Sequence, residues 1–239
     1  MGTNALEKMI KSFCISGDSW ACGEWLRDNF LPGGKQYDLQ RLLLAANFVV
    51  GDISLPGEHN PYTIEKLKSY LDNSPLDYDY VIWFQSDPLR RPEFLEILSN
   101  AKELSLDYDW FIRTSNEFLD HDYSQLNSLG KPIYVIGGLS KINIDLINSY
   151  ENLKPLLVSV SEFLYPNLPH PNLCVGKWML HLDKKVKLDS LELIAQDHKS
   201  MSLWATDVCS KYFNVGDAHP NKDAYRLLFD YILGNINKF

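Results

Sequence analysis

Two short segments, far apart in the chain, carry the residue types that perform nucleophilic catalysis. In the first, Gly17-Asp18-Ser19 follows an apolar run directly and precedes a helix-like stretch. A serine at such a place lies beside the free amide groups of a helix start, which can hold a developing oxyanion. Taken alone, the pattern also fits an aspartate or serine that merely caps the helix. Ser19 is the candidate nucleophile.

The second segment, Asp217-Ala218-His219-Pro220, supplies a candidate base for this serine. An imidazole, with an unperturbed pKa of about 6.5, suits a general base near neutral pH. Asp217 can fix the tautomer of His219 and stabilise its charged form. A surface turn that caps the following helix would contain the same residue types. Together, the two segments predict a Ser-His-Asp hydrolase with Ser19, His219 and Asp217 as its catalytic residues.

The elements that must position these residues are short apolar runs that alternate with helix-like stretches. The runs are residues 12–16, 47–53, 80–84, 133–136 and 156–160. Their nearly continuous apolarity is typical of strands covered on both faces. Helical patterns span residues 20–30, 62–71, 93–104 and 222–237. The alternation predicts a parallel sheet flanked by helices, with ligands bound beyond the carboxyl ends of the strands.

The whole chain has the size and composition of one compact domain, residues 1–239, with 45% hydrophobic residues. A net charge of −8 and the lack of a polybasic cluster disfavour nucleic acid and acidic membrane surfaces as partners. We find neither a signal peptide nor an apolar run long enough to cross a membrane, so we expect a cytoplasmic protein. The irregular, proline-containing stretch 165–193 is expected to be a loop that walls the active site.

Other patterns point to no cofactor. The cysteines form no C-x-x-C pair and are expected to be free thiols in a reducing compartment. His121-Asp122 and His181-Leu182-Asp183 lack a third ligand, so we expect no metal. The charged group of Asp87 with Arg90 and Arg91 could bind an anionic substrate, but a surface ion pair is the simpler interpretation.

The two segments together resemble the conserved blocks of a known family. Residues 13–20, Phe-Cys-Ile-Ser-Gly-Asp-Ser-Trp, resemble the first block of the SGNH/GDSL hydrolases, and residues 217–221, followed by a helix, resemble the last. With residues 22–25, Cys-Gly-Glu-Trp, the opening is similar to that of divergent members from phages and environmental bacteria. The resemblance spans nearly the whole chain. It implies a flavodoxin-like, three-layer α/β/α domain with a parallel five-stranded sheet, and a serine esterase or acyl-hydrolase.

The resemblance also implies an oxyanion hole. The family has a glycine after the second strand, and Gly57 fits that position. A glycine that only forms a turn is an equally good interpretation of Gly57. The family then has Gly-x-Asn-Asp after the third strand, whereas this chain has Phe84-Gln85-Ser86-Asp87. Ser86 falls at the asparagine position and Gln85 is beside it. The implied donors are the amides of Ser19 and Gly57, with Ser86 or Gln85.

A second departure concerns the aspartate. In the family it usually lies three residues before the histidine, where this chain has Gly216; Asp217 lies two before it, a spacing that a related acyltransferase branch uses. A distant carboxylate that orients His219 is the alternative. The expected substrate is a small-molecule or carbohydrate ester, such as an O-acetyl group. Acyl transfer by the same residues, a non-catalytic binding or structural module, and a nucleotide-binding flavodoxin-like protein stay open.

Overall fold

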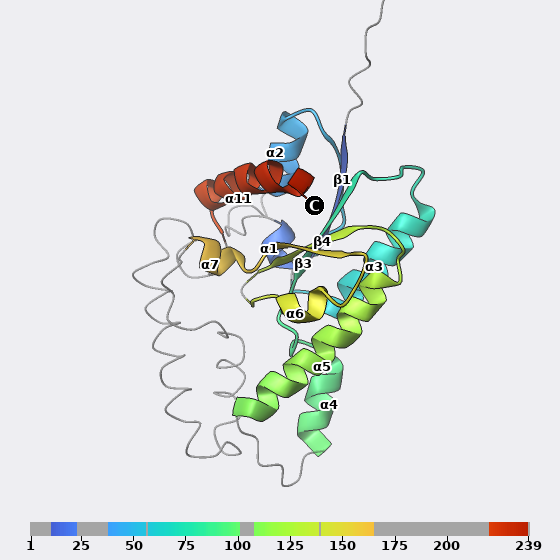
Figure 1. Cartoon of the computed structure of the whole chain (residues 1–239), viewed down its shortest axis with the longest axis vertical. Helices are drawn as coiled ribbons and strands as arrows, with labels where there is room; N and C mark the ends of the chain where they lie inside the picture. Colours follow the sequence, from blue (N-terminus) through green and yellow to red (C-terminus); the bar gives the residue numbers. More distant parts are fainter. Residues whose placement is uncertain are drawn as a thin grey trace, which may run out of the picture.

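A five-stranded parallel sheet forms the centre of the molecule (Figure 1). The computed structural model describes residues 11–22, 38–55, 57–100, 108–138, 140–164 and 220–238. The strand order is β2-β1-β3-β4-β5, and each neighbouring pair is parallel. The strands are β1 (Ser12–Gly17), β2 (Val49–Asp52), β3 (Tyr80–Gln85), β4 (Ile133–Gly137) and β5 (Leu153–Leu157). The predicted α/β fold with a parallel five-stranded sheet is confirmed.

Helices cover both faces of this sheet, which gives three layers. One face carries α1 (Ser19–Cys22), α2 (Leu39–Ala45), α7 (Val160–Leu164) and α11 (Lys222–Asn235), the last followed by a 3-10 turn, η4 (Ile236–Lys238). The other carries α3 (Asn60–Asn73), α5 (Tyr108–Asn127) and α6 (Ile144–Ile147). Helix α4 (Pro92–Asn100) packs on α5, where the rings of Phe94 and Phe111 lie 6.0 Å apart.

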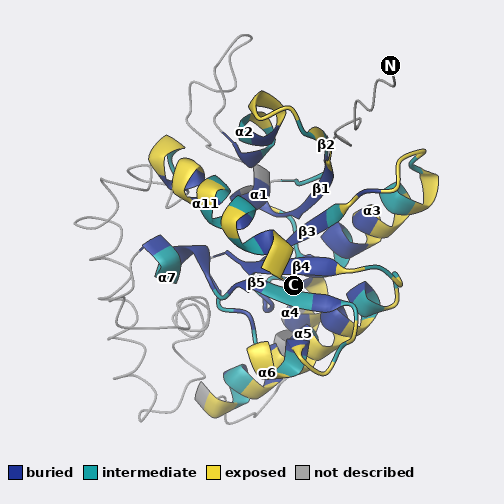
Figure 2. Cartoon of the chain, turned by 45° about the horizontal axis from the view of Figure 1, so that its top comes forward, coloured by how far each residue is buried: buried dark blue, intermediate teal, exposed yellow. Residues whose placement is uncertain are grey.

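Alternate strand residues build a separate core on each face. Ile82 and Phe84 pack towards α2 and α11, whereas Val81 and Trp83 pack towards α3 and α5. Figure 2 shows the central strands in the colour of buried residues and the outer helix faces as exposed. The prediction that the strands are covered on both faces is confirmed for the central ones. It is wrong for β2, an edge strand in which Val49 is 40% exposed.

The fifth strand begins earlier than the sequence predicted. The apolar run 156–160 indicated a strand there, but β5 spans Leu153–Leu157 and Val160 already begins α7. The first half of β5 was missed because it contains Lys154 and Pro155, and proline normally interrupts a sheet. The sheet tolerates Pro155 because β5 is an edge strand, where a backbone N–H can go unpaired.

The predicted helices are found with shifted ends. The patterns 62–71, 93–104 and 222–237 correspond to α3, α4 and α11, and residues 101–104 lie outside the described part. Of the pattern 20–30, only 20–22 is described, as part of α1. The predicted loop 165–193 also lies outside it. Within the described ranges, no helix combines the length and apolarity that crossing a membrane requires.

Candidate active site

The turn that carries Ser19 is built where β1 leaves the sheet. Gly17 has a φ of 141°, and a Cβ atom on it would lie 2.6 Å from the Cβ of Phe84 on β3, so only glycine lets the two strands approach this closely. The next residue fixes the turn: Asp18 Oδ1 accepts a hydrogen bond from the Trp20 amide at 3.0 Å. Ser19 then begins α1 at the carboxyl edge of the sheet.

Asp18 is itself a buried acid, 4% exposed, although the sequence marked it only as a possible cap. Burial raises its pKa to about 6, because a desolvated carboxylate is costly. The Trp20 amide, the Ser86 hydroxyl and the charge of Arg90 each hold the pKa of Asp18 below what burial alone would give, while Asp87 raises it. Asp18 therefore lies between the turn that carries Ser19 and the residues that follow β3.

The raised pKa of Asp18 predicts a pH-dependent stability. Folded protein binds more protons than the unfolded chain between about pH 4 and pH 6, so stability falls as the pH rises through that window. Asp18→Asn, uncharged throughout, should remove this loss and be more stable than wild type by about 1–3 kcal/mol at pH 7, but nearly equal at pH 4. Urea unfolding at both pH values measures the difference.

Asp52 serves as the internal reference for that experiment. Burial raises its pKa to about 6 as well, so it should continue to lower stability in the same window after Asp18 is replaced. The slope of stability against pH should therefore decrease in Asp18→Asn without vanishing. A slope identical to that of wild type would contradict the burial of an acid at position 18.

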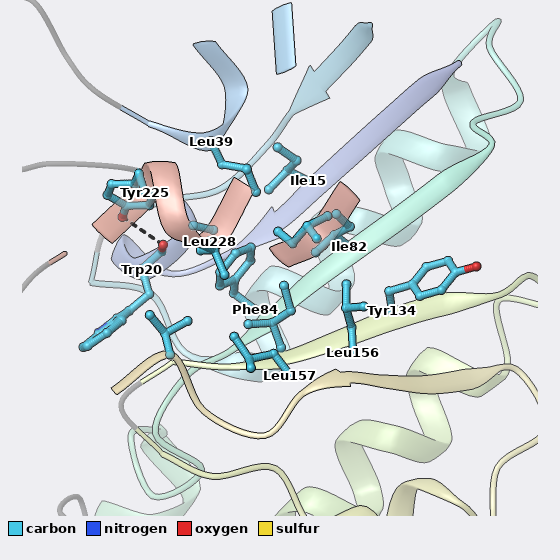
Figure 3. Packing of buried hydrophobic residues seen from close by; sticks show 14 of the residues in the cluster. Ile15, Trp20, Leu39, Ile82, Phe84, Tyr134, Leu156, Leu157, Tyr225 and Leu228 are labelled. Carbon is cyan, nitrogen blue, oxygen red and sulfur yellow. Dashed lines mark hydrogen bonds between the residues drawn. The ribbon is translucent and has the colours of Figure 1, made fainter. Parts of the chain in front are cut away.

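The first turn of α11 is hydrogen-bonded to the turn that carries Ser19. Asn221 caps this helix and accepts hydrogen bonds from the amides of Asp223 and Ala224 at 3.0 and 3.2 Å. The hydroxyl of Tyr225, which is fully buried, donates to the carbonyl oxygen of Trp20 at 3.0 Å (Figure 3). The segment just after the predicted histidine is thus tied to the residue after Ser19. His219 and Asp217 themselves lie outside the described residues.

The loop after β2 reaches the same edge of the sheet. The amide of Leu55 donates to the carbonyl oxygen of Gly17 at 3.0 Å, which extends the pairing of β2 with β1 beyond the strands. Gly57 follows two positions later; it is exposed, with a φ of 75° and nothing within 4 Å of where a Cβ would be. The left-handed backbone explains a glycine there.

After β3, the two candidate oxyanion residues lie in different surroundings. Gln85 is fully buried on the α5 face: its amide nitrogen donates to the carbonyl of Lys141 at 3.0 Å, and its oxygen accepts from the Tyr123 hydroxyl. Ser86 lies against Asp18 instead. Its hydroxyl makes no hydrogen bond of regular geometry among the described residues, yet it lowers the pKa of that acid. The structure therefore brings Ser86, and not the side chain of Gln85, to the Ser19 turn.

Three further polar residues, Asn60, Arg91 and Asp122, form a buried network behind Ser86, and the sequence assigned none of them to the catalytic site. The side-chain oxygen of Asn60 accepts a hydrogen bond from the amide of Ser86 at 2.7 Å, and its nitrogen donates to Asp122 at 3.1 Å. Arg91 pairs with Asp122 at 2.5 Å. Burial raises the pKa of Asp122, and Arg91 and Asn60 oppose that rise.

The surface ion pair predicted for the charges after β3 is wrong for Arg91. Its side chain is 3% exposed and pairs with an aspartate on α5, also buried. That aspartate is the Asp122 that the sequence paired with His121 as a weak metal motif. His121 is exposed and contacts Gln125, and the described residues contain no group of three potential metal ligands. His181 and Asp183 lie outside the described part.

A cavity of about 330 Å³ lies beside the turn after β3. Its wall combines three segments: Asp87 and Pro88 from that turn, residues 140–145 after β4, and Ile112, Ser115, Asn116 and Leu119 from α5. Its lining combines aliphatic side chains with hydroxyl, amide and charged groups. A volume and lining of this kind suit a small, partly polar molecule.

No protein-family model and no curated protein matches the chain. Among solved structures, it is similar to a member of the lipolytic protein G-D-S-L family from Veillonella parvula, with 16% identity, 96% of this chain and 100% of that chain covered, and a TM-score of 0.39. AlinE4, an SGNH-hydrolase family esterase, has 15% identity, 96% of each chain covered and a TM-score of 0.38. The psychrotrophic esterase EstA from Pseudoalteromonas sp. has 14% identity, 95% and 97% covered and a TM-score of 0.41. The chain is thus similar, at low identity and over nearly its whole length, to GDSL/SGNH-family esterases of known structure.

Proposed function

We propose that this protein is a serine hydrolase that cleaves a small ester, with Ser19 as nucleophile, His219 as base and Asp217 as the carboxylate that orients it. The observation that carries the proposal is the hydrogen bond from Tyr225 to the carbonyl of Trp20. It ties the first turn of α11 to the turn of Ser19, and only Pro220 and Asn221 separate His219 from that helix. A connection of two residues spans at most about 10 Å when fully extended, which supports a histidine able to reach the Ser19 turn.

In the proposed reaction, His219 takes the proton of the Ser19 hydroxyl while the serine oxygen attacks the ester carbonyl carbon. The oxyanion is stabilised by the amide at the start of α1 and by the amide of Gly57, with Ser86 as a third candidate donor. When the carbon–oxygen bond breaks, His219 returns the proton to the departing alcohol. Water, deprotonated by the same imidazole, then releases the acyl group from Ser19.

The cavity beside the turn after β3 supports one class of substrate. Its volume accommodates a group of the size of one sugar ring, and its hydroxyl, amide and charged side chains suit a polar alcohol rather than a long acyl chain. This supports an ester of a small polar molecule, such as an O-acetylated carbohydrate. Transfer of the acyl group to another hydroxyl would use the same residues, with the acceptor in place of water.

A fluorophosphonate probe tests the proposal directly. The probe phosphonylates only an activated serine, so wild-type protein should be labelled on the peptide that contains Ser19, and Ser19→Ala should not be labelled. Mass spectrometry of the digested protein locates the adduct. Labelling at another serine, or unchanged labelling in Ser19→Ala, would contradict the assignment of Ser19 as the nucleophile.

One observation favours a second candidate, a non-catalytic binding module with the same fold. The third oxyanion position holds Ser86, whose hydroxyl is buried against Asp18, and the neighbouring Gln85 amide is bound to a backbone carbonyl. Loss of one such donor lowers kcat by about 100–1000-fold in serine hydrolases. Folded protein that is not labelled by the probe and does not turn over any ester would favour the module.

A further inference from the structure

We propose that Asn60 is a positioning residue of the active site, which links the buried Arg91–Asp122 pair to the turn after β3 and so holds Ser86 against the turn of Ser19. This inference rests on the proposed function. It adds a residue that does not contact the substrate and that no sequence motif marks. The support is a continuous chain of buried polar contacts from α5 to the nucleophile turn.

The contacts of Asn60 require an amide side chain. The residue is 1% exposed, so both ends of its side chain need partners inside the protein. Its oxygen accepts from the Ser86 amide at 2.7 Å, and its nitrogen donates to Asp122 Oδ2 at 3.1 Å. A carboxylate in its place would face a second carboxylate, and an apolar side chain would leave the Ser86 amide without an acceptor.

The far end of the chain of contacts is rigid. The guanidinium of Arg91 pairs with Asp122 at 2.5 Å and lies 4.3 Å from the centre of the Phe118 ring on α5. Its Nε atom donates to the carbonyl of Pro88 at 3.0 Å. The turn after β3 is thus held to α5 near both of its ends, at Ser86 through Asn60 and at Arg91 through Asp122. Such a clamp leaves the turn little freedom to move.

The near end of the chain of contacts lies at the nucleophile. Ser86 comes two residues after Phe84, which pairs with Gly17 in the sheet, so Ser86 lies beside Asp18. The carboxylate of Asp18 accepts from the Trp20 amide at 3.0 Å and so fixes the backbone on either side of Ser19. Asn60 therefore acts through Ser86 and Asp18. A displacement of about 1 Å at such a position can lower the rate by about 100-fold even when the substrate still binds.

Substitutions at both ends of the Asn60–Asp122 hydrogen bond test this arrangement. Asn60→Asp places two carboxylates together, and Asp122→Asn removes the partner of Arg91; each should lower kcat for p-nitrophenyl acetate by about 100-fold with little change in KM. In the double variant N60A/D122N, both substitutions break the same chain of contacts, so the loss in kcat should be clearly smaller than the product of the two single losses. A loss equal to that product would show that the two residues act separately.

A matched control separates positioning from general stability. Ile133→Val trims the fully buried side chain at the amino end of β4, far from the Ser19 turn, and should lower the melting temperature without changing kcat. If Asn60→Asp does not fold, Asn60→Ala removes both contacts without adding a charge and should show the same fall in kcat.

The possible results distinguish the inference from the proposed function. Wild-type protein with neither turnover nor labelling would overturn the proposed function and this inference with it. Active wild-type protein whose kcat is unchanged by N60D or N60A, or single losses that multiply in N60A/D122N, would overturn the role of Asn60 alone. An equal fall in kcat in Ile133→Val would do the same.

Discussion

Replacement of Ser19 by alanine is expected to lower kcat for p-nitrophenyl acetate by about 10⁴–10⁶-fold, because the acyl-enzyme can no longer form. The melting temperature should stay close to that of wild type, since Gly17 and the Asp18 carboxylate fix the turn. Steady-state kinetics together with thermal unfolding measure both quantities. Ser69→Ala, an exposed serine on α3, is the matched control and should keep full activity.

The same experiment with His219 tests whether the two residues act together. His219→Ala should lower kcat nearly as much as Ser19→Ala does. The double variant should lower kcat no further than either single variant, because a serine without its base and a base without its serine are equally inactive. Losses that multiply in the double variant would show independent roles. Full activity in Ser19→Ala would remove the basis of the proposed function.

Most of the sheet was predictable because parallel strands covered on both faces appear in a sequence as continuous apolar runs, and a turn residue marks the end of each run. β1, β3 and β4 follow that pattern closely. β5 does not, since its first half contains Lys154 and Pro155, which only an edge strand accommodates. Whether a strand is an edge strand depends on the strand order, which periodicity does not reveal.

The residues of the candidate active site differ in the same respect, since some could be predicted from the sequence and others could not. Ser19 and His219 stand in short local patterns whose residue types have a direct chemical meaning. Asn60, Arg91 and Asp122 do not, since Asn60 and Arg91 reach Asp122 across 62 and 31 positions of the chain. Only the folded arrangement of α3, α5 and the turn after β3 brings them together. No signal in a single sequence marks such a network.

For Gln85 the sequence did contain a usable signal. It follows Phe84 in a strand, and side chains alternate between the faces of a sheet, so Gln85 must share the face of Trp83. That face packs against α3 and α5, whereas Trp20 of the nucleophile turn packs on the opposite one. Ser86, the first residue beyond the strand, is free of this alternation, and it lies beside Asp18.

Gly17→Ala should lower both stability and activity, because a methyl group there meets the Cβ and carbonyl oxygen of Phe84 at 2.6 and 2.7 Å, at a φ of 141°. The collision and the strained backbone together should cost about 2–5 kcal/mol. Gly130→Ala is the matched control: its φ is 68°, but nothing lies within 4 Å, so only about 1 kcal/mol should be lost. Urea unfolding compares the two.

Since β1 must separate from β3 to admit the methyl group, the turn of Ser19 moves with it, and kcat should fall by about 100-fold in Gly17→Ala alone. Equal stability losses in the two variants would show that the close approach of β1 to β3 does not require the glycine.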